Sequence, residues 1–295
     1  MARSTPPRDL STPPRPGSKT RAEILAVDGD HARRRADHLA TEEPMEIRLQ
    51  AGGETRTVAV TMRTPGSDFE LAAGFLFGEG VVTPREAIER ITYCMDPEVD
   101  ADQQYNIVTV ALREERLPDL ASLERHFYTT SACGACGKAS LEALRLRSCP
   151  VIPPGPEVAP DLLAGLPERL REAQGIFKVT GGLHAAVLFD AGGAMVSLRE
   201  DVGRHNAMDK LIGWALLDGR LPLHDHIVMV SGRASFELLQ KSVVAGLPIF
   251  CAVSAPSSLA VDVAKAFGIT LVGFLRGRKF NVYSAPERIR ISGSG

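Results

Sequence analysis

Two successive strand–helix units in the last third of the chain constrain its fold more than any other feature. Apolar runs of strand length occupy 227–230, 249–253 and 270–274, and a helical pattern separates each run from the next. Such an alternation requires crossover connections, which are right-handed and give parallel strands that are buried on both faces. The sequence therefore predicts an α/β core of three layers, which we assign to residues 158–295.

The segment 41–128 shows a different pattern. Strand-like runs at 45–49 and 57–62 surround a glycine pair and predict a hairpin. The residues 67–70 match the Ser-x-x-Glu capping box, which predicts the start of a helix. A further helix is expected over 84–91. Together these elements indicate a smaller α+β region before the core.

Residues 1–40 hold five prolines, many arginines and few apolar side chains. A segment of this composition buries too little apolar surface to offset the entropy lost on ordering, so a disordered tail is expected. Residues 129–157 are assigned to a Cys-x-x-Cys loop and a Pro-rich connection.

Composition excludes several classes of protein. The chain has 34 basic and 36 acidic residues and a formal charge of -2, which argues against a general nucleic-acid binder. No apolar run approaches the roughly 20 residues of a membrane-spanning helix, and the first residues lack the apolar core of a secretion signal. Five cysteines are too few and too scattered for a disulfide framework. We expect a cytoplasmic protein.

Cys133 and Cys136 form a Cys-x-x-Cys motif, with Lys138 close behind. If a helix begins at this motif, free backbone N–H groups and the helix dipole stabilise the thiolate of Cys133. A nearby lysine and the motif itself also lower the pKa of a cysteine. The motif therefore indicates sulfur chemistry or metal binding.

Ligands of open parallel sheets bind beyond the carboxyl ends of the strands. Two of the loops at these ends lead into helix N-termini, which attract anions, so a phosphate-bearing ligand such as a nucleotide is expected. Each serine in these loops can equally cap its own helix. The loop residues are small, hydroxyl-bearing or cationic: Ser231, Gly232, Arg233, Ser254, Ser257, Arg276, Gly277, Arg278 and Lys279.

The polar segment 199–210 stands between an apolar strand and an apolar helix, which suggests a site. In a helix that begins near Val202, His205 and Asp209 share a face. The plainer interpretation makes Asp201 a helix cap and His205 a satisfied, half-buried imidazole.

Three kinds of chemistry fit a Cys-x-x-Cys motif. A zinc deaminase also needs a His-x-Glu pair, which the chain lacks, and a structural zinc site normally needs four ligands. A zinc-binding or deaminase-like protein that uses Cys133, Cys136 and a histidine remains the alternative. Sulfur transfer through a cysteine persulfide fits best, because it needs an ionisable thiol, a second thiol and an anion site for the acceptor.

Four blocks of sequence, at 130–138, 200–210, 231–235 and 254–260, resemble the signature blocks of the FdhD family of formate dehydrogenase accessory sulfurtransferases. The resemblance runs from about Glu42 to Ile289. It implies a core similar to that of cytidine deaminases without the catalytic zinc, and hence no tightly held metal. It also implies a homodimer.

The resemblance further implies a function and a site. Sulfur passes from a cysteine desulfurase, as a persulfide, to a molybdenum or tungsten bis(guanine dinucleotide) cofactor that is then inserted into formate dehydrogenase. Cys133 corresponds to the persulfide-bearing cysteine and Cys136 to its partner. The family's binding stretch for this guanine-nucleotide-containing cofactor corresponds to Phe274, Leu275, Arg276, Gly277, Arg278 and Lys279, and we add His205 to the candidate cofactor contacts.

Overall fold

The computed structural model describes residues 15–94, 96, 98–100, 103–120 and 151–291. Its larger part is a six-stranded sheet made of β7 (His184–Asp190), β8 (Met195–Asp201), β9 (His226–Val230), β10 (Ile249–Ala252), β11 (Thr270–Arg276) and β12 (Lys279–Ser284). The order across the sheet is β12-β11-β10-β9-β7-β8. Strands β9, β10 and β11 are parallel, and the other strands are antiparallel to their neighbours. The parallel run is the one that the apolar segments predict.

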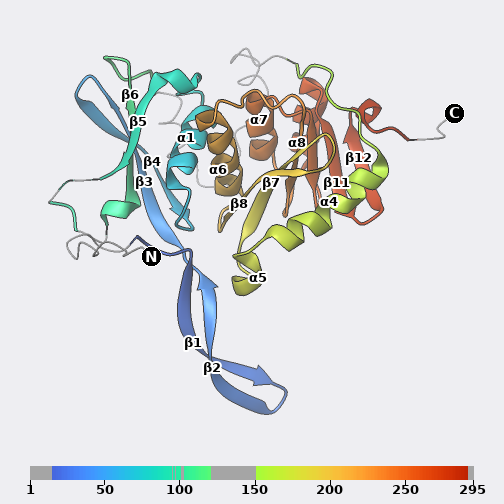
Figure 1. Ribbon diagram of the computed structural model, residues 1–295, viewed down its shortest axis with the longest axis horizontal. Helices are drawn as coiled ribbons and strands as arrows, with labels where there is room; N and C mark the ends of the chain where they lie inside the picture. The colour runs from blue at the N-terminus through green and yellow to red at the C-terminus, as the bar shows by residue number, and fades with distance from the viewer. Residues whose placement is uncertain (1–14, 95, 97, 101–102, 121–150, 292–295) are drawn as a thin grey trace, which may run out of the picture.

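Helices cover both faces of this sheet (Figure 1). One face carries α6 (Arg204–Leu217), α7 (Phe236–Ala245) and α8 (Ser258–Phe267), and the other carries α4 (Pro160–Ala173), which the short α5 (Phe177–Thr180) follows. Along β9, Val228 and Val230 belong to the hydrophobic cluster beneath α6 and α7, whereas Ile227 and Met229 belong to the cluster beneath α4. The alternation follows from the two-residue period of a strand. The three-layer α/β core is thus confirmed. None of the described helices is long and apolar enough to cross a membrane.

A four-stranded sheet forms the N-terminal region, with the order β4-β3-β6-β5. Its strands are β3 (Glu43–Ala51), β4 (Glu54–Arg63), β5 (Ile88–Tyr93) and β6 (Ile107–Leu112). Helix α1 (Asp68–Gly78) lies between this sheet and α6 (Figure 1). One hydrophobic cluster therefore continues from the smaller sheet through α1 to α6 and α7. The predicted hairpin is confirmed as β3 and β4, and the region has the expected α+β composition.

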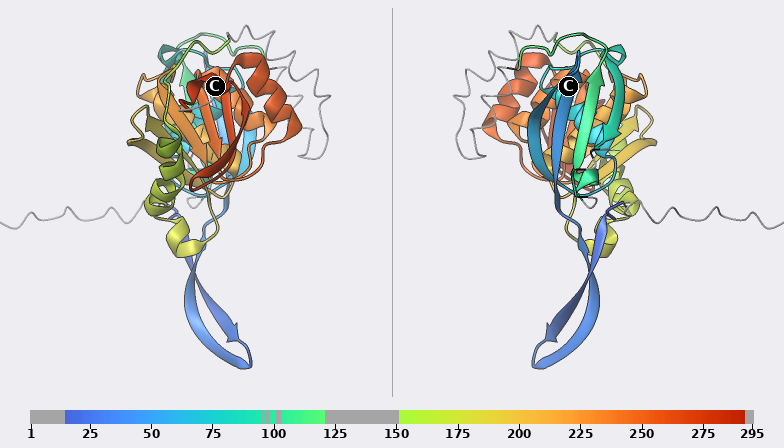
Figure 2. Two further views of the ribbon diagram at one scale, coloured as in Figure 1. Left: turned by 90° about the vertical axis from the view of Figure 1, so that its right-hand side faces the viewer. Right: turned by 90° about the vertical axis from the view of Figure 1, so that its left-hand side faces the viewer.

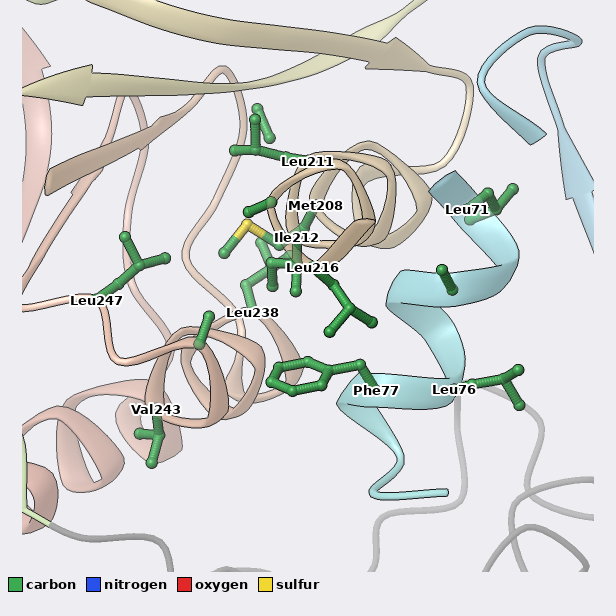
Figure 3. Close-up of a cluster of buried hydrophobic side chains, with 14 of the residues drawn as sticks. Leu71, Leu76, Phe77, Met208, Leu211, Ile212, Leu216, Leu238, Val243 and Leu247 are labelled. Atoms are coloured by element: carbon green, nitrogen blue, oxygen red, sulfur yellow. The ribbon is translucent and has the colours of Figure 1, made fainter. Parts of the chain in front are cut away.

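Helices α1 and α6 approach each other closely at two glycines. Figure 3 shows apolar side chains of both helices in one cluster with Leu238 of α7. A Cβ atom added to Gly74 would lie 1.9 Å from the carbonyl oxygen of Asp209, and one added to Gly213 would lie 1.8 Å from the carbonyl oxygen of Glu70. Because these neighbours are backbone atoms of regular helices, a small side-chain movement cannot relieve either contact.

We expect the substitution Gly74→Ala to lower the free energy of unfolding by about 1–3 kcal/mol or more, because it forces α1 and α6 apart. The matched control is Gly165→Ala, also within a helix, where an added Cβ meets no atom within 4 Å. That change should raise stability by up to about 1 kcal/mol, the difference in helix propensity. Denaturant unfolding of the two variants measures both effects. A Gly74→Ala variant as stable as the Gly165→Ala variant would contradict the close crossing.

The expectation of a disordered tail over 1–40 is wrong for residues 19–40. These form the hairpin of β1 (Lys19–Asp28) and β2 (His31–Ala40), whose ten pairs keep one register from end to end. A two-residue turn with Gly29 at φ 57 joins the strands. None of the hairpin residues is buried, so the composition of the segment gave no sign of a folded hairpin. Figures 1 and 2 show that the hairpin projects away from the rest of the molecule. Residues 1–14 lie outside the described residues.

Two local expectations also differ from the structure. Residues 84–91 hold only a short 3₁₀ turn at Arg85–Ala87 before β5 begins, because this segment pairs with β6. The capping box does mark the start of α1, but Ser67 has φ 56 and its side chain makes no cap hydrogen bond. The carboxylate of Glu70 instead accepts a hydrogen bond from Arg199 of β8, with 2.8 Å between Nη2 and Oε1. Glu70 therefore connects α1 to β8 and does not cap its own helix.

Candidate functional site at the carboxyl edge of the sheet

Five strand ends meet at one edge of the six-stranded sheet. The parallel strands β9, β10 and β11 end there. Because β7 is antiparallel to β9, and β8 to β7, His184 at the start of β7 and Asp201 at the end of β8 pair at the same edge. Three helices also begin at this edge, with Gly203, Ser235 and Ser257 as the N-caps of α6, α7 and α8. Their N-terminal N–H groups make the edge attractive to anions.

The predicted serines shape the loops of this edge. Ser231 accepts a hydrogen bond at its Oγ from the second residue of β7 at 2.9 Å, and Ser257 caps α8 by accepting one from the backbone N–H three residues on, at 3.2 Å. The backbone N–H of Ser254 donates to the carbonyl of Gly232, and its carbonyl accepts from the N–H of Phe274. The capping interpretation is therefore correct for Ser257. These hydrogen bonds connect the loop after β9 with the loop after β10, and the loop after β10 with β11.

The predicted cofactor stretch forms the end of a β-hairpin rather than the expected loop. Arg276 is the last residue of β11, Gly277 turns the chain at φ 55, and Lys279 begins β12. Leu275 is fully buried, so it anchors the hairpin and does not face a ligand. Phe274 has φ 53 and is 42 % exposed. A large side chain held in a left-handed conformation at the surface is a feature of binding sites.

The cations of this hairpin are exposed, as contacts to a phosphate require. Arg278 is ion-paired with Asp161 of α4 at 2.8 Å, and both side chains are largely open to solvent. Such a pair contributes little to stability, so Arg278 can exchange Asp161 for an anionic ligand at small cost.

His205, in the first turn of α6, faces the start of α7. Its Nε2 lies 3.4 Å from Ser235 Oγ and 3.6 Å from Glu237 Oε2. The interaction with the neighbouring imidazole of His205 outweighs partial burial and lowers the pKa of Glu237 to about 2. Glu237 is therefore a carboxylate throughout the physiological range.

A second group of basic side chains surrounds the start of β7. Burial lowers the pKa of His184, and the nearby charges of Arg204, His205 and Arg233 lower it further. Arg204 Nε is buried without a hydrogen-bond partner among the described residues. Arg233, predicted from the loop pattern, thus lies in a basic group with Arg204 and His184, where an anion would be stabilised.

A buried network fixes the beginning of α6 to the N-terminal region. Asp201 Oδ2 lies 2.6 Å from Lys210 Nζ and accepts a hydrogen bond from the backbone N–H of Thr64 at 3.1 Å. Its Oδ1 accepts from the N–H of Gly203 at 2.8 Å, within the turn before α6. The N-cap of α6 is Gly203 and no side chain caps it, so the expectation that Asp201 caps the helix is wrong. Asn206 Nδ2 donates to the carbonyl of Met62 in β4 at 2.7 Å. The orientation of His205 therefore depends on contacts that cross between the two sheets.

A cavity of about 460 Å³ lies beside this junction, between β4, α1, α6 and α7. Within it, the fully buried Asp209 and Lys241 form an ion pair at 2.6 Å. Burial opposes the charge on Lys241, but Asp209 and Glu79 together raise its pKa, so it is an ammonium. The lining residues are Ile47, Val58, Ala59, Val60, Thr61, Leu71, Phe75, Glu79, His205, Asn206, Asp209, Glu237 and Lys241.

Sequence reasoning missed Arg204 and Glu237, and it left Ser235 open between helix cap and ligand contact. Arg204 stands in the polar segment 199–210 and Ser235 closes the block 231–235, so both had a signal in their neighbourhood. Glu237 had none, because a single glutamate in a first helical turn is ordinary. Cys133 and Cys136 lie outside the described residues. In the described part of the chain, no three His, Cys, Asp or Glu side chains gather as a metal site would require.

Comparison with known proteins identifies the family. Residues 40–290 match the model of the FdhD/NarQ family, which is most of the chain. The chain belongs to the FdhD/NarQ family. Among similar relatives of this FdhD/NarQ protein, the sulfur carrier protein FdhD of Streptomyces avermitilis is 53% identical over 274 residues, which are 92% of this chain and 95% of that protein.

Other relatives extend the comparison. The sulfur carrier protein FdhD of Mycobacterium tuberculosis is 51% identical and covers 90% of this chain and 96% of its own. A crystal structure of a proposed formate dehydrogenase accessory protein from Desulfotalea psychrophila matches with a TM-score of 0.69 and 26% identity. That match covers 92% of this chain and 99% of the chain from Desulfotalea psychrophila. Both sheets thus belong to the fold that the two structures share.

Proposed function

We propose that this protein is a sulfur carrier, a sulfurtransferase needed for formate dehydrogenase activity. The observation that carries the proposal is similarity over 92% of the chain, at 53% identity, to a protein named as a sulfur carrier. The Cys-x-x-Cys motif at 133–136 supplies the thiols that such a carrier needs.

Loading begins with the thiolate of Cys133. It attacks the outer sulfur of a persulfide on a cysteine desulfurase, and the sulfur–sulfur bond of the donor breaks. The donor leaves as a thiolate, and Cys133 becomes the persulfide. No net oxidation occurs, because one thiolate replaces another on the same sulfane sulfur. Cys136 stands close enough in sequence to assist, or to attack the persulfide and release its sulfur.

The acceptor in this proposal is the metal of a molybdenum or tungsten bis(guanine dinucleotide) cofactor, which is a substrate of the carrier. When the outer sulfur passes to the metal, its bond to Cys133 breaks and the Cys133 thiolate is restored. The metal centre supplies the two electrons that reduce the sulfane sulfur to sulfide. The completed cofactor then enters formate dehydrogenase. The homodimer and the place of the protein in the cytoplasm stay predictions.

The carboxyl edge of the six-stranded sheet is the proposed cofactor site. It combines the N-termini of three helices with the exposed cations of the β11–β12 hairpin and the exposed ring of Phe274. Guanidinium groups bind phosphates in a forked geometry, and aromatic faces stack on bases. The edge is therefore suited to a ligand with both phosphates and flat rings.

Replacing Arg276 and Arg278 together with alanine should weaken the binding of guanosine diphosphate (GDP) by at least about tenfold, since each lost charged hydrogen bond costs about 1.5–3 kcal/mol. The remaining affinity should depend less on salt, because fewer charges are screened. Titration calorimetry at two salt concentrations measures both effects. The matched control removes Arg33 and Arg35 from the exposed β2 strand. Equal affinity in the two double variants would place the phosphates elsewhere.

The function itself is tested by following sulfur. The purified protein is charged with a cysteine desulfurase and cysteine that carries radiolabelled sulfur, separated from the donor, and mixed with cofactor and inactive formate dehydrogenase. Label should move to the cofactor as enzyme activity appears. The proposal would be contradicted if formate dehydrogenase were activated equally well without the carrier. It would also be contradicted if the enzyme became active while the label stayed on the carrier.

A further inference from the structure

The hairpin of β1 and β2 (residues 19–40), which we call the projecting hairpin, exposes both of its long edges. It is a separate two-stranded sheet, so neither strand has a second neighbour among the described residues. None of its residues is buried, and Leu25, Val27 and Leu39 are 61%, 68% and 48% exposed. An isolated two-stranded hairpin is marginally stable in water, and free edges accept further strands. The projecting hairpin therefore has the properties of a surface that another chain covers.

The free edge of β2 is cationic. Arg33, Arg34 and Arg35 stand together in this strand. Arg35 lies 3.7 Å from Asp37, whereas neither Arg33 nor Arg34 has an ion-pair partner in the described part of the chain. Because successive side chains of a strand point to opposite faces, a strand added at this edge meets positive charge on both of its faces. Acidic residues in the added strand would complement these charges.

Two occupants from this protein fit the edge poorly. Each copy of β2 has three arginines and one aspartate, so pairing two copies of the strand would leave a net repulsion. Residues 1–14 contain Arg3 and Arg8 but only one acidic residue, Asp9, so their net charge has the same sign as that of the edge. The occupant that complements the edge is an acidic, extended segment of a different protein.

The projecting hairpin joins the molecule at the carboxyl edge of the six-stranded sheet. Its strand β2 packs on α5, and Figure 1 shows the hairpin leaving the molecule on the side where α5 lies. A Cβ atom added to Gly182 would lie 3.6 Å from the Cβ of Ala40, the last residue of β2. Gly182 stands just before His184, where β7 begins at the carboxyl edge. A protein bound to the hairpin therefore lies next to the proposed cofactor site.

We propose that the projecting hairpin binds the protein that receives the completed cofactor, namely cofactor-free formate dehydrogenase, through an acidic, extended segment of that enzyme. The segment adds to the free edge of β2 as a further strand. Backbone hydrogen bonds hold it along the edge, and its carboxylates pair with the three arginines. This inference rests on the proposed function, and it places the recipient beside the site from which the cofactor leaves.

The test measures the binding of purified, cofactor-free formate dehydrogenase to the full-length protein. Changing Arg33, Arg34 and Arg35 together to glutamate should weaken this binding at least about tenfold, because attraction between the two surfaces becomes repulsion. Wild-type binding should also weaken as the salt concentration rises. The matched control makes the same charge change at three exposed arginines outside the hairpin: Arg90, Arg116 and Arg171. Binding by this control should stay within about twofold of the wild type.

A second variant separates backbone pairing from charge. The pair of Asp28 and His31 flanks the two-residue turn and is hydrogen-bonded, so the alternation along the ladder directs the N–H groups of Glu23 and Ala36 to the two free edges. Ala36→Pro removes the outward N–H of β2 and keeps the ladder inside the hairpin, so it should weaken binding severalfold. Glu23→Pro makes the matched change on the edge of β1 and should bind at least as tightly as the wild type.

Three results would overturn the proposal. The first is a wild type that does not bind the enzyme, or a glutamate variant that binds it as tightly as the wild type. The second is a smaller mass of the glutamate variant alone in analytical ultracentrifugation, since a second copy would then occupy the hairpin. The third is slower sulfur loading from the desulfurase with unchanged binding of the enzyme, since the donor would then occupy it.

Two further measurements complete the test. Melting temperatures show that the variants are folded, and if the glutamate variant does not fold, the comparison of Ala36→Pro with Glu23→Pro decides. Persulfide loading of Cys133 in the wild type tests the proposed function without using the projecting hairpin. Its failure is therefore distinguished from failure of this inference, in which loading is normal and binding of the enzyme does not depend on β2.

Discussion

Cells that carry the Cys133→Ala variant should show no more formate dehydrogenase activity than cells without the protein. The persulfide can form only on a thiolate, and alanine cannot carry sulfur. Folding should be unchanged, since the substitution removes only the sulfur atom of one side chain. Formate dehydrogenase activity and the melting temperature of the purified variant measure the two expectations.

The matched control for this variant is Cys251→Ala. Cys251 is fully buried in β10, and burial raises the pKa of its thiol to about 12, so it is no nucleophile. Its loss should lower stability slightly, as removal of a small buried side chain does, and leave maturation intact. If the Cys133→Ala variant supported maturation as well as the Cys251→Ala variant, sulfur would have to travel by another thiol.

Among the substitutions considered, Arg63→Ala should have the largest effect on stability, lowering the free energy of unfolding by about 3–5 kcal/mol. Arg63 is completely buried, and its Nε and Nη2 lie 3.1 and 3.3 Å from the two carboxylate oxygens of Asp68. Nη2 also donates to Asn106 Oδ1 at 3.0 Å and to the carbonyl of Tyr105 at 3.2 Å. Alanine leaves a buried carboxylate without its counter-charge and two further acceptors without a donor.

Loss of Arg63 should also weaken the other contacts of Asp68. The phenol of Tyr93 donates to Asp68 Oδ2 at 3.1 Å, and burial together with Asp68 raises the pKa of Tyr93 to about 12. Chemical denaturation measures the loss, and Arg35→Ala, which breaks an exposed pair with Asp37 at 3.7 Å, is the control with an expected change below about 1 kcal/mol. Similar losses in both variants would mean that burial of Arg63 adds nothing to the interaction.

The core could be predicted because its signal is local. Strands such as β9 and β10 are short apolar runs that alternate with helices, and this pattern requires parallel strands whatever the rest of the chain does. The hairpin of β1 and β2 has no such signal, since none of its residues is buried and pairing along the backbone connects its two strands. The segment 84–91 was misjudged for a related reason, because its pairing with β6 comes from residues distant in sequence.

The sequence indicated where the candidate site lies in the sheet, but not which side chains contact one another there. The rule for parallel sheets singled out one edge, and the structure brings the predicted loops together there, because strand order and direction fix which loops are neighbours. The roles of individual side chains depend on partners far along the chain. Ser231 bonds to β7, Glu70 to Arg199, and Asn206 to the carbonyl of Met62, over separations that no local motif encodes. The pair of His205 and Glu237 likewise exists only after α6 and α7 have packed.

Mass spectrometry of the wild-type protein, after incubation with a cysteine desulfurase and cysteine, tests the central claim most directly. The peptide that contains Cys133 should gain the mass of one sulfur atom, and the gain should disappear on treatment with a thiol and be absent without the desulfurase. A protein that never gains this sulfur, and instead holds a zinc ion through Cys133 and Cys136, would contradict the account.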